Sequence, residues 1–177
     1  ELLLAIAQSQ GLNPALDAAI RARRDRNSIR DRCKTLAGFV REAWDVLEPG
    51  KPLAWGWALD AMCEHLEAIS RGEITRLLIN CPPGMMKSLL VGVFWPAWEW
   101  GPLGRPDLRI LGASYKEDFA VRDARRQREL ISSAWYQTLY GSQVHIVRGG
   151  EGDYANNHAG WRKGFSLASL TGERGDR

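Results

Sequence analysis

The spacing of apolar residues predicts a helical first part of the chain. Two stretches before residue 72 carry apolar side chains mostly three or four positions apart, which is the pattern of an amphipathic helix. The first face consists of Leu36, Phe39, Val40, Trp44 and Leu47, and the second of Leu59, Met62, Cys63, Leu66 and Ile69. Residues 1–10 and 13–24 are also expected to be helical. The break at residues 48–52 divides the chain into a helical arm, residues 1–50, and a core, residues 51–177.

Short apolar runs alternate with helical segments after residue 75. We expect strands at residues 77–79, 108–113, 144–147 and 164–170, and helices at residues 116–132 and 135–141. Residues 148–160 are rich in glycine and asparagine and are expected to form a loop. A strand–helix–strand order favours parallel pairing across a crossover helix. The predicted fold class is therefore α/β, with a mostly parallel sheet flanked by helices on both faces.

The stretch around residues 75–100 has the order strand, tight loop, Lys-Ser, helix that is typical of a phosphate-binding loop. A helix N-terminus offers unpaired backbone N–H groups to a polyphosphate. In this interpretation Lys87 reaches the β- and γ-phosphates and the Ser88 hydroxyl binds Mg²⁺. The other residues of the predicted loop are Pro82, Pro83, Gly84, Met85 and Met86.

The usual pattern of such loops, G-x-x-x-x-G-K-[ST], is only partly present. Cys81 and Met86 occupy the two glycine positions. On the pattern alone, a Pro-Pro-Gly turn with buried methionines and an exposed lysine remains an alternative.

Residues 72–88, which contain CPPGMMKS, resemble the ATPase domain of large terminase subunits, the DNA-packaging motors of tailed bacteriophages. The resemblance extends to residues 57–67, 113–128 and 170–177. It implies a P-loop NTPase fold, ATP and Mg²⁺ as cofactors, and double-stranded DNA as the translocated substrate. It also implies a small terminase subunit, a portal protein and further copies of the chain in a ring as partners, in the cytoplasm of a bacterial host. A helicase-like ATPase and a non-catalytic, truncated assembly module remain alternatives.

Further site residues follow from the same resemblance. Trp57 lies in the region that holds adenine in the family, although Ala58 stands where members often have histidine, and packing on the sheet is the alternative role for Trp57. Arg174 or Arg177 would act as an arginine finger toward a neighbouring subunit. Arg122 and Arg125 are candidates for contact with DNA or a subunit, or belong to a solvated helix face.

A P-loop ATPase also needs a carboxylate at the end of an apolar strand to hold Mg²⁺ and one to orient water. No acid after Ser88 follows four apolar residues, since Asp107, Asp118 and Asp176 all follow polar or glycine-rich segments. We therefore expect an incomplete ATPase domain without the family's nuclease domain, and little or no hydrolysis by this chain alone.

Composition narrows the class of protein further. Hydrophobic residues make up 45% of the 177 residues and charged residues 25%, as in ordinary globular proteins. The three cysteines show no paired spacing, which argues against a disulfide framework or a zinc site. No apolar run has the length of a membrane span. The net charge of +3 permits nucleic-acid contact without requiring it. Trp95 and Trp98 are expected in the core rather than on a base-stacking surface.

Overall fold

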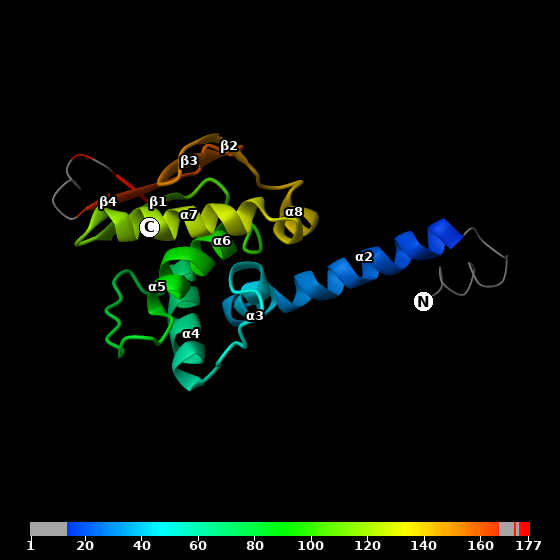
Figure 1. Cartoon of the computed structure of the whole chain (residues 1–177), viewed down its shortest axis with the longest axis horizontal. Coiled ribbons are helices and arrows are strands. Elements are labelled where there is room, and N and C mark those ends of the chain that lie inside the picture. Colours follow the sequence, from blue (N-terminus) through cyan, green and yellow to red (C-terminus); the bar gives the residue numbers. More distant parts are fainter. Residues whose placement is uncertain (1–13, 167–171, 173) are drawn as a thin grey trace.

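A computed structural model describes residues 14–166, 172 and 174–177 of the chain (Figure 1). The predicted helix at residues 1–10 and part of the strand at 164–170 lie outside these residues. The described helices are α2 (Pro14–Arg32), α3 (Leu36–Leu47), α4 (Trp57–Arg71), α5 (Lys87–Leu89), η1 (Leu90–Phe94), α6 (Trp95–Trp100), α7 (Glu117–Ser132) and α8 (Ala134–Tyr140). The strands are β1 (Arg109–Ser114), β2 (Ile146–Gly149), β3 (Asp153–Asn156) and β4 (Trp161–Ser166). The chain therefore belongs to the α/β class.

The sheet is mixed, whereas the sequence predicted a mostly parallel one. Its four strands run in the order β1-β4-β3-β2, with β1 and β4 parallel and the other two pairs antiparallel. The antiparallel pairs arise because β3 forms inside the segment that was predicted to be a loop. The Asn156 side chain accepts hydrogen bonds from the backbone N–H groups of His158 and Gly160, at 2.9 Å and 3.1 Å. This tight turn brings β4 back beside β3.

The helices lie on one side of the sheet rather than on both (Figure 1). Helix α7 contacts β1, β2 and β4, and the helical run from α5 to α6 packs beneath α7. One hydrophobic cluster joins α3, α4, η1, α6, α7 and α8. Residues of α3 therefore share a core with residues after position 51, while the predicted division at residue 50 remains untested.

Residues 77–79, the strand predicted before the phosphate loop, form no regular secondary structure. Leu77 and Ile79 are partly buried and pack against the core, but Leu78 is 84% exposed. A strand needs a neighbour to satisfy its backbone N–H and C=O groups. Among the described residues no strand lies beside this segment, so the apolar pattern alone does not produce one.

The helix after the loop continues through Pro96, a residue type that usually kinks or ends a helix. Proline has no N–H to donate and its ring collides with the carbonyl four residues earlier. A π-helical turn at η1 precedes it, and Trp95 donates its N–H to the carbonyl of Leu90. This wider turn accommodates the proline. The expected burial of Trp95 and Trp98 is confirmed, since they are 8% and 3% exposed.

Helix α2 extends away from the rest of the molecule (Figure 1). None of its residues is buried, and it carries Arg21, Arg23, Arg24, Arg26 and further charged side chains. The basic stretch at residues 21–32 is thus part of one exposed helix. Within the described part of the chain, no helix has both the length and the hydrophobicity required to cross a membrane.

Candidate nucleotide-binding site

The loop before α5 contains two residues in the left-handed backbone conformation. Gly84 and Met86 both have positive φ, 86° and 59°. Met86 is the residue directly before the helix, with ψ of 7°. Left-handed backbone favours glycine because a side chain there collides with the following carbonyl. Met86 thus adopts a conformation that glycine, the residue at this position of the common pattern, would adopt without strain.

Lys87 and Ser88 open a helical run that continues from α5 through η1 to Trp100. The first turn closes with a 2.9 Å hydrogen bond from the Leu90 N–H to the Met86 carbonyl. The N–H groups at the start of such a run have no acceptor within the helix and carry a partial positive charge. Both side chains are exposed, so an anion can reach this end of the helix.

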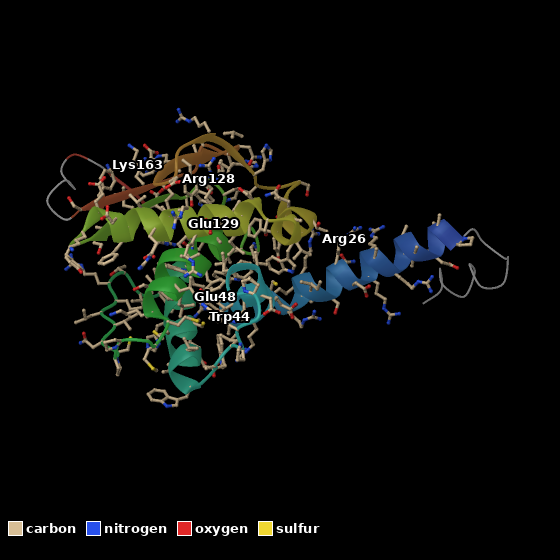
Figure 2. All side chains as sticks on the ribbon, viewed as in Figure 1. Arg26, Trp44, Glu48, Arg128, Glu129 and Lys163 are labelled. Atoms are coloured by element: carbon tan, nitrogen blue, oxygen red, sulfur yellow. The ribbon has the colours of Figure 1, made fainter. Side chains whose placement is uncertain are left out.

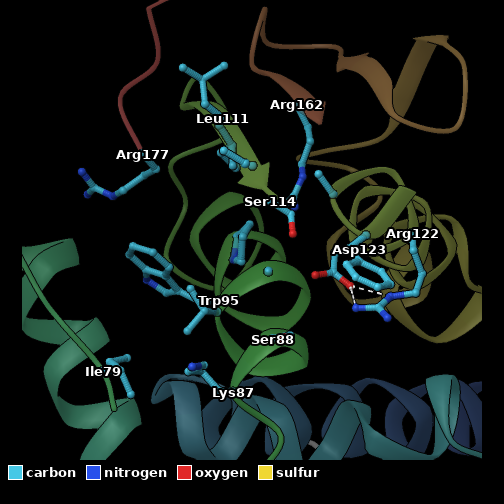
Figure 3. A pocket seen from close by; sticks show the side chains of 18 of the residues that line it. Ile79, Lys87, Ser88, Trp95, Leu111, Ser114, Arg122, Asp123, Arg162 and Arg177 are labelled. Atoms are coloured by element: carbon cyan, nitrogen blue, oxygen red, sulfur yellow. Dashed lines mark hydrogen bonds and ion pairs between the residues drawn. The ribbon is translucent and has the colours of Figure 1, made fainter. Parts of the chain in front are cut away.

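Two cavities flank the Lys87–Ser88 turn. The sheet-side cavity, of about 840 Å³, lies between β1, α7 and the helical run, with residues 110–115 along one wall (Figure 3). The loop-side cavity, of about 630 Å³, is lined by residues 81–89 together with Trp44, residues 52–54 and Arg126. Lys87, Ser88, Arg122 and Asp123 line both. The predicted loop residues 82–88 are thus brought together around one space.

Asp123 is a candidate site residue that the sequence pattern did not indicate. Asp123 is the acidic residue among the described residues that line the two cavities. Figure 3 shows its carboxylate directed into the sheet-side cavity. Arg122 donates two hydrogen bonds to its Oδ1 atom, at 3.0 Å and 2.8 Å. Its Oδ2 atom lies 3.1 Å from where a Cβ of Gly92 would be. Because Gly92 is four residues after Ser88, the carboxylate lies over the helix face that carries the serine.

The predicted adenine residue lies outside both cavities. Trp57 is 83% exposed at the start of α4, so it does not pack on the sheet either. Trp55 instead packs against the core, donates a 2.8 Å hydrogen bond to Asp60, and has the Arg41 guanidinium 4.0 Å from its ring centre. In the loop-side cavity, Trp44 is the aromatic residue near the loop.

The four candidate arginines have different surroundings. Arg122 reaches both cavities. Arg125 is exposed on α7 and lies 3.7 Å from Glu129, away from the cavities. Arg174 is also exposed and lines neither cavity. Arg177 lines the sheet-side cavity and forms a 2.9 Å ion pair with Glu99.

Glu99 belongs to a buried polar network behind the sheet-side cavity. It is completely buried and accepts hydrogen bonds from Ser70 at 2.8 Å and Arg177 at 2.9 Å. Ser70 also accepts a 2.8 Å hydrogen bond from the Trp95 indole N–H. Burial raises the pKa of the Glu99 carboxyl, and its Oε2 atom has no partner among the described residues. The network ties α4, α6 and the last residue of the chain together.

The last residues lie along the free edge of β1. Leu111 donates its N–H to the carbonyl of Arg177 at 2.8 Å, and Arg177 donates to the carbonyl of Arg109 at 3.2 Å, as in a parallel strand pair. The Arg109 guanidinium donates two hydrogen bonds to the Asp176 carboxylate. Hydrogen bonds from Arg109 lower the pKa of Asp176 to about 2. This contact fixes Arg177 at the wall of the sheet-side cavity.

The described residues contain no group of three or more His, Cys, Asp or Glu side chains that would hold a metal ion alone. A metal at the Lys87–Ser88 turn would need oxygen atoms from a bound ligand as well. Comparisons with protein-family models, with curated proteins and with solved structures found no match.

Proposed function

We propose that this chain is the nucleotide-binding part of a P-loop ATPase and, following its sequence resemblance, of a viral DNA-packaging motor. The observation that carries the proposal is the left-handed backbone of Met86 immediately before Lys87 and Ser88 at the start of a long helical run. A Pro-Pro-Gly turn with an exposed lysine has no need for methionine in this unfavourable conformation.

The geometry supports binding of a nucleoside triphosphate across the turn. Backbone N–H groups of residues 84–88 would contact the β-phosphate, and the Lys87 ammonium would neutralise the β- and γ-phosphates. Mg²⁺, when bound with the nucleotide, would offset the charge of these oxygens. Among the residues that line both cavities, Ser88 and Asp123 have side-chain oxygen atoms that would be suited to hold it.

We place the base in the loop-side cavity, because the predicted loop itself forms this cavity together with the Trp44 ring and residues 52–54. Basic side chains line both cavities, and the sheet-side cavity carries one more of them. An indole face and apolar side chains favour a planar heterocycle over a phosphate. We therefore assign to Trp44 the packing role that the resemblance implies for Trp57.

Titration of Mg·ATP into the chain, followed by tryptophan fluorescence, tests the proposal. We expect saturable binding by the wild type and loss of binding in Lys87→Ala. Lys34→Ala is the matched control, because Lys34 is an exposed lysine that lines neither cavity. Equal affinity in both variants, with circular dichroism showing folded proteins, would contradict the assignment.

The exposed helix α2 supports a role for the first part of the chain in contacting DNA or another subunit. It buries no side chain, and arginines predominate along it. Contacts between arginine and DNA phosphates are independent of sequence and weaken with salt. Binding of double-stranded DNA should therefore fall steeply as salt increases and should weaken when Arg23, Arg24 and Arg26 are changed to Gln. Unchanged DNA affinity in that variant would point to a protein partner such as a further copy of the chain.

A further inference from the structure

Arg162 is a buried cation for which the described part of the chain supplies no carboxylate partner. Its side chain is 2% exposed and extends from β4 into the sheet-side cavity (Figure 3). The Nη1 atom donates a 2.8 Å hydrogen bond to the Gln127 side-chain oxygen, a neutral acceptor. The Nε atom is buried and has no hydrogen-bond partner among the described residues. No carboxylate of those residues lies within ion-pair distance of this guanidinium, and the nearby Asp123 is paired with Arg122.

The position of this guanidinium is fixed by its surroundings. Tyr154 donates a 2.9 Å hydrogen bond to the same Gln127 oxygen, which holds the acceptor in place. On the neighbouring strand, Gly112 leaves room: a Cβ there would be 3.0 Å from the Arg162 Nη2 atom. Figure 2 draws these side chains together with those of the other described residues. The Arg162 guanidinium is therefore held in this position before any ligand binds and does not extend into solvent.

A buried charge of this kind is costly unless an opposite charge compensates it. Burial accordingly lowers the pKa of Arg162. The described walls of the cavity carry further basic side chains, Lys87, Arg122 and Arg177. Arg122 is paired with Asp123, the acid among the described lining residues, and Arg177 with Glu99. Ser114, at the end of β1, directs its hydroxyl into the same space (Figure 3). Most of the other lining side chains are apolar, so the polar groups near Arg162 and Ser114 are mainly hydrogen-bond donors, which suit a small oxyanion better than a cation.

We infer that Arg162 and Ser114 bind a phosphate-sized oxyanion in the sheet-side cavity, supplied either as free phosphate or as the terminal phosphate of a nucleotide. The guanidinium would donate through its Nη2–H groups, because the Nε atom is itself buried, and the serine would donate through its hydroxyl. The first source needs no nucleotide at all. The second rests on the proposed function, because it requires ATP bound across the Lys87–Ser88 turn.

The test compares wild-type protein with Arg162→Met in two titrations. Inorganic phosphate is added against chloride at equal ionic strength while thermal unfolding is followed, and ATP and ADP affinities are then measured without phosphate. Arg125→Met is the matched control, because Arg125 is exposed and lines neither cavity. It reports any general effect of phosphate on stability.

Loss of a charge-assisted hydrogen bond should weaken binding of the oxyanion by about tenfold or more. If the anion is free phosphate, phosphate should raise the unfolding temperature of wild type and control but not of Arg162→Met. If it is the terminal phosphate of a nucleotide, Arg162→Met should lose ATP affinity while it keeps ADP affinity. Should the folded variant match wild type in both titrations, the inference is wrong, even if Lys87→Ala abolishes nucleotide binding.

Gly112→Ala is a second variant, which retains the buried charge of Arg162. It provides a test of the inference if Arg162→Met does not fold. Its added methyl group would lie 3.0 Å from the Arg162 Nη2 atom, so the guanidinium would have to shift by a few tenths of an ångström and would take up space in the cavity differently. We expect Gly112→Ala to weaken binding of the same anion. Unchanged binding of the anion by a folded Gly112→Ala protein would also overturn the inference.

Discussion

Replacing Gly84 by alanine isolates the contribution of the loop backbone, because the site offers no steric complication. Its φ is 86°, and an added Cβ would meet nothing within 4 Å. The cost therefore comes from the backbone conformation alone, about 1–2 kcal/mol for an L-residue in the left-handed region. For a chain of this size that corresponds to a fall in unfolding temperature of about 2–8 °C.

Two other glycines provide controls for this substitution. Gly104 has a φ of 72° and is equally open, but it lies outside both cavities. Gly150 is open as well, and its φ lies outside the left-handed range. Gly104→Ala should lose about the same stability as Gly84→Ala, about 1–2 kcal/mol. Gly150→Ala should lose none of this stability, because its backbone conformation is open to any residue.

Thermal unfolding and Mg·ATP titration of the three variants separate stability from binding. We expect only Gly84→Ala to weaken nucleotide binding, since a relaxed loop no longer directs its N–H groups toward one phosphate. Equal ATP affinity in Gly84→Ala and Gly104→Ala would refute the reasoning that the shape of this loop creates the site.

Three further predictions concern the surroundings of the site. Because the pKa of Asp176 is lowered to about 2, its contribution to stability should be complete above pH 3.8 and lost as the pH falls toward 2. Acid unfolding of Asp176→Asn should lack this pH-dependent loss of stability. Identical acid unfolding curves for the wild type and Asp176→Asn would contradict the prediction. Ser70→Ala removes a donor from the buried Glu99 carboxylate, and a loss of about 1–3 kcal/mol in urea unfolding is expected; a loss below about 0.5 kcal/mol would mean that the network is not coupled to folding. Trp44→Ala should weaken ATP binding, whereas Trp57→Ala, at an 83% exposed position, should leave it unchanged; the reverse result would restore Trp57 as the adenine contact.

The helices were predictable from sequence because their apolar faces are unambiguous. Residues 36–47 and the helix that ends before Gly72 agree with the structure. Strands were harder to predict from the sequence, because a strand depends on partner strands that can be distant in sequence. Residues 77–79 have the right residue types but no neighbouring strand among the described residues. Strand β3 has only four residues inside a polar segment, so its sequence gives little indication of it.

The candidate site was predictable where neighbouring residues make it and not where the fold brings distant residues together. The loop and Lys87–Ser88 follow directly from the order of residues. Asp123 was overlooked because the search required an acid after a strand, whereas this one comes from a helix packed over Gly92. Arg162 gave no signal at all, since nothing in its neighbourhood of the sequence marks an arginine as buried.

We propose that backbone N–H groups of residues 84–88 bind the phosphates of a nucleotide. Amide resonances of uniformly ¹⁵N-labelled protein, followed during addition of Mg·ATP, test this binding mode directly. We expect the largest shifts at Gly84, Met85, Met86, Lys87 and Ser88, and we expect Lys87→Ala to abolish them. Saturable shifts confined to other parts of the chain, with these five amides unchanged, would contradict it.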